Sequence, residues 1–181
     1  MRVKYDIWTQ NMSEWAKDNS FSFKVVKTPS IGFRLDYFII EMNFESEKLG
    51  EIKISQSSVG TKDDVGLSYL KFENQNNEVI NFDLSLYQRD FFDRLFNRNK
   101  IKTDNTEFNK RFGVITNNKL LAQELFTDSK TQTFFLGNSF LTFNIVKSLI
   151  TMKSMNMKSY EKNEIQELFD MYMHILKLLT H

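Results

Sequence analysis

Cysteine is absent from this chain of 181 residues, and its absence removes several classes of site at once. Without a thiol there is no disulfide framework, no thiolate zinc or iron–sulfur site, and no cysteine nucleophile. A chain of this length buries roughly 70% of the surface that its unfolded form exposes. It can therefore form a stable hydrophobic core without such cross-links.

Glycine, proline and histidine are also scarce, with 6, 1 and 2 occurrences. The glycines stand apart from one another, so neither the GxxxxGK phosphate loop nor the GxGxxG dinucleotide-binding turn occurs. His181 is the last residue, and His174 has neither a second histidine at metal-binding spacing nor a Gly-x-Ser-x-Gly motif. We interpret His174 as a boundary residue on a helix, and we expect no bound cofactor.

The net charge is close to zero, +1 from 24 basic and 23 acidic residues. Such a balance gives no general attraction to nucleic acid or to anionic membranes. No apolar run approaches the ~20 residues of a membrane helix, and Met1–Gln10 does not resemble a signal peptide. We therefore expect a cytoplasmic protein with no membrane segment and no nucleic-acid partner.

Phenylalanine is the abundant residue, with 18 occurrences. Asparagine and lysine are also frequent, and all three residues have A/T-rich codons. We attribute this bias to a low-GC bacterial genome. An aromatic-lined ligand pocket is the alternative, and the sequence does not separate such a pocket from an aromatic core.

Hydrophobic spacing predicts an amphipathic helix near each end of the chain. Tyr5, Trp8, Met12 and Trp15 recur at helical spacing over residues 4–18, and a longer apolar stripe runs over residues 159–179. Ser159 is positioned to cap the second helix. Each stripe either packs on the body of the chain or binds a partner.

Alternating apolar residues predict several strands between these helices. The expected strands are 21–27, 33–44, 52–54, 67–73, 79–86, 112–116, 141–145 and 148–155, and shorter helices are expected at 88–98, 118–126 and 129–136. The strand at 33–44 is apolar on both faces, which predicts a central position covered on both sides. Short turns favour antiparallel pairing. We predict an α+β fold with a mostly antiparallel sheet packed against helices, in one domain over residues 1–181 with a soft division near residue 100.

A short pattern of acidic and apolar residues lies in the stretch KTDNTEFNKRFGVITNNKLLAQELF, from Lys102 to Phe126. Its positions are Asp104, Glu107, Phe108, Phe112, Val114, Ala122 and Leu125. Together with the hairpin expected over Phe140–Met152, it resembles a domain of unknown function in uncharacterised bacterial proteins. Members of that family carry transmembrane segments ahead of this region, and this chain shows none. The resemblance implies no activity.

Carboxylates are the remaining candidates for catalytic residues. The most specific set is Asp36 and Glu51, together with Lys53. An aspartate on one strand, followed by Glu-x-Lys on the next, is the layout of many metal-dependent nucleases. Asp36 and Glu51 would hold Mg²⁺, and Lys53 would orient the attacking water. Glu51 and Lys53 share one face of a strand, and Ile52 and Ile54 share the other. Because any half-exposed strand shows this alternation, a metal-dependent phosphodiesterase is the alternative hypothesis.

Methionine is the other residue type that suggests a binding surface, and several methionines lie towards the C-terminus. Methionine adapts to irregular contacts and is common on binding surfaces, although core filling explains it equally. The candidate interface residues are Met155, Met157, Met171, Met173, Trp8 and Trp15. Since no catalytic constellation is complete, we favour a non-enzymatic binding or assembly module. It would form a homodimer or bind a protein partner through its terminal helices.

Overall fold

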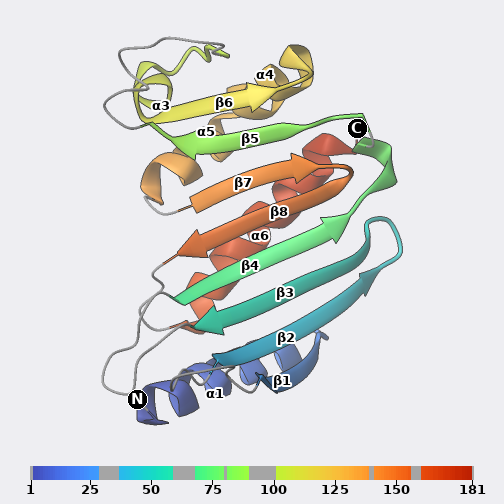
Figure 1. Ribbon diagram of the computed structural model, residues 1–181, viewed down its shortest axis with the longest axis vertical. Helices are drawn as coiled ribbons and strands as arrows, with labels where there is room; N and C mark the ends of the chain where they lie inside the picture. The colour runs from blue at the N-terminus through green and yellow to red at the C-terminus, as the bar shows by residue number, and fades with distance from the viewer. Residues whose placement is uncertain are drawn as a thin grey trace. The chain divides into compact units, whose positions relative to one another are not determined.

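The computed structural model describes residues 2–28, 37–58, 68–79, 81–89, 101–138, 141–155 and 160–180. Within these ranges lie five α-helices, one 3-10 helix and eight β-strands (Figure 1). The strands are antiparallel wherever their register is defined, so the predicted α+β class is confirmed. The chain forms two compact units. Unit 1 comprises Met1–Asn74 and Lys153–Asp170, and unit 2 comprises Gln75–Met152 and Met171–His181.

The strands of unit 1 follow one another in chain order. They are β1 (Ser22–Thr28), β2 (Tyr37–Ser46), β3 (Gly50–Ser58) and β4 (Ser68–Gln75). β2 lies between β1 and β3, so its predicted inner position is confirmed. The turn between β2 and β3 ends at Gly50, whose φ of +71° is one that glycine adopts without strain.

The amphipathic N-terminal helix is confirmed as α1 (Arg2–Asp18), and its stripe belongs to the core of unit 1. Trp8, Met12 and Trp15 are all buried. The Trp15 ring lies edge-on to Phe169 at 5.4 Å between centroids, and its Nε1–H donates to Oε1 of Gln166 at 2.8 Å. Both partners lie in α6 (Lys162–Leu179), the predicted C-terminal helix. A tryptophan with a packed ring and a satisfied N–H is a stable core residue.

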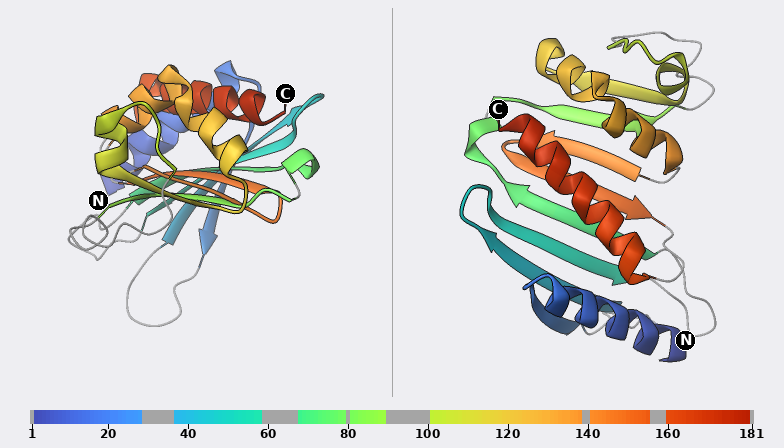
Figure 2. Two further views of the ribbon diagram at one scale, coloured as in Figure 1. Left: turned by 90° about the horizontal axis from the view of Figure 1, so that it is seen from above. Right: turned by 180° about the vertical axis from the view of Figure 1, so that it is seen from behind.

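The helices of unit 1 lie on one face of its strands (Figure 2). The buried side chains of β2 and β3, Ile40, Met42, Ile52 and Ile54, are all completely inaccessible to solvent. The opposite face, called here the charged face, carries Glu41, Lys53, Tyr69, Lys71 and Glu73, which are partly exposed. On it Lys53 pairs with Glu41 at 3.4 Å, and Lys71 pairs with Glu73 at 2.8 Å. Within the described part of β2, the predicted burial of both faces is therefore wrong, because Glu41 and Asn43 occupy the second face.

The strands of unit 2 have the order β8-β7-β5-β6. Their bounds are Leu84–Gln88 for β5, Phe112–Thr116 for β6, Leu141–Val146 for β7 and Leu149–Met155 for β8, the last of which begins in this unit. The strand predicted over 79–86 begins only at Leu84. A 3-10 turn, Asn77–Val79, precedes it, and the N–H of Phe82 donates to the carbonyl of Val79 at 3.0 Å.

Three short helices of unit 2 each begin at a side-chain cap. α3 (Thr106–Arg111) is capped by Asn105, α4 (Lys119–Thr127) by Asn118, and α5 (Ser129–Gly137) by Asp128. In each case the side-chain oxygen accepts from a backbone N–H three residues later, which satisfies an otherwise unpaired donor. α4 and α5 were predicted, whereas α3 falls where a loop was expected. Phenylalanine rings fill the core beneath them, namely Phe108, Phe112, Phe126, Phe135 and Phe143.

The hairpin of β7 and β8 turns through Lys147 and Ser148, whose φ angles are +49° and +68°. Two consecutive positive φ angles define the hairpin turn that usually takes Asn-Gly. The turn is held from outside, because the N–H of Asn76 donates to the carbonyl of Ser148 at 2.9 Å, and the N–H of Lys147 donates to Asp83 Oδ1 at 3.2 Å. No helix in the described ranges is long and apolar enough to cross a membrane.

Candidate functional site

The structure describes only two of the three residues in the predicted set of carboxylates and lysine. Glu51 and Lys53 lie on one face of β3, and Ile52 and Ile54 are buried on the other, as expected. Lys53 pairs with Glu41 at 3.4 Å, and Glu51 lies directly opposite Glu45 in the register of β2 and β3. Asp36 lies outside the described residues.

In the described ranges, no group of three or more histidine, aspartate or glutamate residues is arranged to hold a metal ion. The hypothesis of a metal site that uses Asp36 and Glu51 stays a prediction.

The candidate interface residues fall into two groups. Trp8, Trp15 and Met171 are buried, and they fill the cores of their units. Met155 and Met173 are half-buried, and Met157 lies outside the described residues. The apolar stripe of α6 is likewise buried, at Ile165, Leu168, Tyr172, Ile175 and Leu176. An interface through the terminal helices would therefore have to use side chains outside these stripes.

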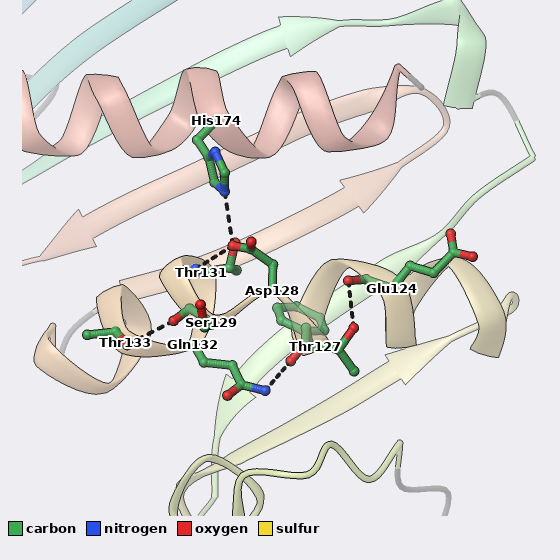
Figure 3. A network of polar contacts seen from close by, with 9 residues as sticks. Glu124, Thr127, Asp128, Ser129, Thr131, Gln132, Thr133 and His174 are labelled. Atoms are coloured by element: carbon green, nitrogen blue, oxygen red, sulfur yellow. Dashed lines mark hydrogen bonds and ion pairs between the residues drawn. The ribbon is translucent and has the colours of Figure 1, made fainter.

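A polar network in unit 2 connects α5 with the C-terminal half of α6 (Figure 3). Oδ2 of Asp128 lies 2.9 Å from Nε2 of His174, and it also accepts from the N–H and the Oγ1 of Thr131, both at 2.7 Å. Burial works to raise the pKa of Asp128, but hydrogen bonds from His174 and Thr131 outweigh it and hold that pKa below its ordinary value. Asp128 thus serves two purposes, as the cap of α5 and as the partner of His174.

This network holds the imidazole in a fixed orientation, which is one requirement of a catalytic histidine. Among the hydrogen bonds of the described residues, however, no hydroxyl group binds the other ring nitrogen of His174. We therefore regard the pair as a structural joint between two helices. Sequence analysis did not identify a partner for His174, because Asp128 lies 46 positions away in the chain.

Strand β6 is the most distinctive surface element of unit 2. It lies at the end of the strand order, and β5 is its only partner among the described strands. Its residues, FGVIT, include no charge and no proline, and Ile115 is 59% exposed. No other described segment hydrogen-bonds to Gly113, Val114 or Ile115. In the ladder with β5, the backbone groups of Gly113 and Ile115 face β5, and those of Val114 face away from it. The N–H of Phe112 donates to the carbonyl of Phe108, and Phe112, Gly113 and Val114 are buried, so Ile115 is the most exposed residue of the strand.

Helix α4 adds apolar surface next to this strand. It begins three residues after β6 ends, and its first turn exposes Leu120 at 75% and Leu121 at 41%. We call the strand with these two leucines the β6 edge. Scattered exposed leucines are ordinary on protein surfaces, but here three large apolar side chains lie within seven positions of the chain, in and just after the end strand.

Tyr87 covers Gly113 on the outer face of unit 2, the face opposite its buried side chains. The two residues are register partners on β5 and β6, and a Cβ at position 113 would lie 2.4 Å from Cζ of Tyr87. Only glycine lets the tyrosine ring cross the strand here. Ile115, on the same face, lies opposite Ser85, whose hydroxyl donates to Asn144 Oδ1 at 2.7 Å. Within β5 and β6 themselves the outer face carries no charged residue, and Asp83 and Arg89 flank it.

Comparisons were made with protein-family models, curated proteins and solved structures, and none of them finds a match to this chain.

Proposed function

We propose that this protein is a binding or assembly module whose docking surface is the β6 edge. The observation that carries the proposal is an end strand with no charge, no proline and an exposed Ile115. Natural proteins usually blunt such strands with lysine, proline, a bulge or a covering segment. The described β6 has neither lysine nor proline, which leaves it suited to contact with another extended segment.

If a partner binds by strand addition, different parts of the β6 edge would have different roles. The backbone groups of Val114 and Thr116, which face away from β5, would supply hydrogen bonds that are largely independent of the partner's sequence. The exposed Ile115 would supply an apolar contact on the outer face, and Leu120 and Leu121 would extend it beyond the end of the strand. Because only one short strand is offered, binding would be weak and reversible.

The end strand of unit 1 supports the same view by contrast. β1 also has one partner among the described strands, but its sequence SFKVVKT carries Lys24 and Lys27. Lys24 is exposed, and a charge at that position disfavours pairing with another strand. The two end strands thus differ in their protection against pairing, because β1 carries lysines and β6 carries no charge.

A peptide titration tests the proposal. The probe is a fluorescent, acetylated and amidated peptide of alternating valine and threonine, which is uncharged and prefers an extended conformation. Anisotropy of the peptide at about 1 µM, titrated with protein up to about 500 µM, should show saturable binding with a dissociation constant on the order of 100 µM. Ile115→Lys should weaken that binding at least tenfold, because it places a hydrated charge on the docking strand.

Val25→Lys is the matched control, because Val25 is an exposed residue on β1, the other end strand. It should leave peptide binding unchanged. Equal binding by wild type and Ile115→Lys would contradict the proposal, as would loss of binding in Val25→Lys alone. Circular dichroism of each variant confirms that the fold is retained.

A further inference from the structure

We infer that the interior of unit 1 binds a single water molecule, which bridges Gln56 of β3 and Tyr160, the residue two positions before α6. Both side chains are completely inaccessible to solvent. Water is the smallest molecule that both donates and accepts hydrogen bonds, and proteins bury it where two to four polar groups would otherwise lack partners. The site is independent of the β6 edge, because both residues belong to unit 1.

Gln56 is a buried amide in an apolar part of the sheet. It lies on the same face of β3 as Ile52 and Ile54, which are buried. Its register partners, Ile40 on β2 and Leu70 on β4, are also inaccessible to solvent. Neither Nε2 nor Oε1 of Gln56 has a hydrogen-bond partner among the described residues. Because a buried amide without hydrogen bonds is strongly unfavourable, this one requires a partner that the surrounding side chains do not supply.

Tyr160 brings a second polar group to the same place. Its ring lies edge-on to Trp8 of α1, with 4.9 Å between centroids, and its φ of +49° is a conformation that a bulky residue rarely adopts. Burial raises the pKa of Tyr160, and the side chains of Ser68 and Gln56 partly offset that rise. These two side chains therefore lie beside the Tyr160 hydroxyl. The hydroxyl nonetheless has no partner with hydrogen-bond geometry in the part of the chain that the structure describes.

The number of donors and acceptors favours a bridging molecule over a direct contact. The Gln56 amide has an acceptor at Oε1 and donors at Nε2, whereas Tyr160 has a single hydroxyl. If that hydroxyl turned towards one amide atom, the other amide atom would remain unpaired in the core. A water molecule both donates and accepts, so it can bond to the amide and to the hydroxyl at once. Ser68 is a third polar neighbour of the hydroxyl.

Two other buried amides of the chain are held by protein groups instead. Nδ2 of Asn74 donates to the carbonyls of Leu49 and Glu51, at 2.7 and 2.9 Å. In unit 2, Nε2 of Gln132 donates to the carbonyl of Phe126. Neither amide nitrogen therefore needs a water molecule. Gln56 differs from both, because neither of its amide atoms has a partner among the described residues.

Magnetic relaxation dispersion of the water nuclei tests the site directly, because it counts water molecules that stay bound for longer than the protein takes to tumble. Gln56→Met keeps the length of the side chain and removes the amide, so it should remove one long-lived water molecule relative to wild type. Gln132→Met is the matched control, because the Gln132 amide donates to a protein carbonyl, and it should not lower the count. An unchanged count in Gln56→Met would overturn the inference.

Urea denaturation supplies a second test, of whether Gln56 and Tyr160 share the same water molecule. Tyr160→Phe keeps the ring that packs against Trp8 and removes only the hydroxyl. The double variant Gln56→Met with Tyr160→Phe should shift the urea midpoint by less than the sum of the two single shifts, because both changes act on one bound molecule. Shifts that add would show that the two side chains have no common partner and would overturn the bridge. Circular dichroism confirms that each variant is folded.

Discussion

The two units have the same kind of interior but leave different surfaces to solvent. Unit 1 packs tryptophan and phenylalanine rings under α1, and unit 2 packs phenylalanine rings under its short helices. The charged face of unit 1 pairs its lysines with glutamates, and its end strand β1 carries two more lysines. The strand β6 itself carries no charged residue. Stability therefore comes from similar cores, and the difference that matters for the proposed binding lies in the end strands.

Removal of the largest ring from each interior should have the greatest effect and tests whether the cores are equivalent. Trp15→Ala in unit 1 and Phe135→Ala in unit 2 should each lower the free energy of unfolding by about 3–5 kcal/mol, because both side chains are buried. Urea denaturation measures the loss. Ile7→Ala is the control for α1, because Ile7 is 49% exposed, and it should cost less than about 0.5 kcal/mol. A small loss in Trp15→Ala would mean that the α1 stripe is not core.

Gly113→Val should have the next largest effect, because its Cβ would collide with the Tyr87 ring. We expect a loss of about 1–3 kcal/mol in the free energy of unfolding, as in other overpacked sites. Gly137→Ala is the control, since nothing lies within 4 Å of a Cβ there. The double variant Tyr87→Ala with Gly113→Val should recover part of the loss. If Gly113→Val is as stable as wild type, the tyrosine does not cover β6.

Asp128→Asn should lower stability by about 1 kcal/mol at pH 6, because asparagine keeps the α5 cap but weakens the contact with His174. The pKa of Asp128 is lowered in the folded protein. Its charge therefore contributes stability that is present above the unfolded value of about 3.9 and is lost as the pH falls through the folded pKa. Urea denaturation at several pH values should show the difference between wild type and variant shrinking below about pH 4. A difference independent of pH would contradict this assignment.

Glu51→Gln probes the charged face and should have the smallest effect. Glu51 lies opposite Glu45, so removing one charge should stabilise the protein by a few tenths of a kcal/mol, about 0.2–0.5. Thermal unfolding with and without Mg²⁺ or Mn²⁺ gives a second readout, and we expect no shift in Tm. A rise in Tm with metal that Glu51→Gln abolishes would instead support the metal hypothesis, because a bound ligand stabilises the folded state.

Local patterns in the sequence predicted most of the elements of this fold. The helical spacing of Trp8, Met12 and Trp15 gave α1, and the alternation of Ile52 and Ile54 with Glu51 and Lys53 gave the two faces of β3. Asn118, which caps α4, is a residue type that is favoured at this position. These features depend on neighbours within one or two turns, so the sequence displays them directly.

The missed features depend on partners far along the chain or on competing local signals. The pairing of His174 with Asp128, and the cover of Gly113 by Tyr87, join positions 46 and 26 residues apart. α3 was missed because the asparagines and threonine around it suggested a loop, although Asn105 and Glu107 are also a helix start. The end position of β6 follows from strand order, which no local pattern contains. Only the lack of charge in β6, in contrast to the lysines of β1, can be read directly from the sequence.

The order of the segments along the chain determines when each unit can be completed during synthesis. Unit 1 opens with Met1–Asn74 but is completed by Lys153–Asp170, after every residue of Gln75–Met152 has been made. Trp15 therefore has no hydrogen-bond partner in Gln166 until 151 more residues have been added. At typical translation rates this takes on the order of ten seconds. During that interval the nascent chain carries an uncovered tryptophan stripe. Unit 2 in turn needs Met171–His181, so the late helix α6 completes the two units in close succession.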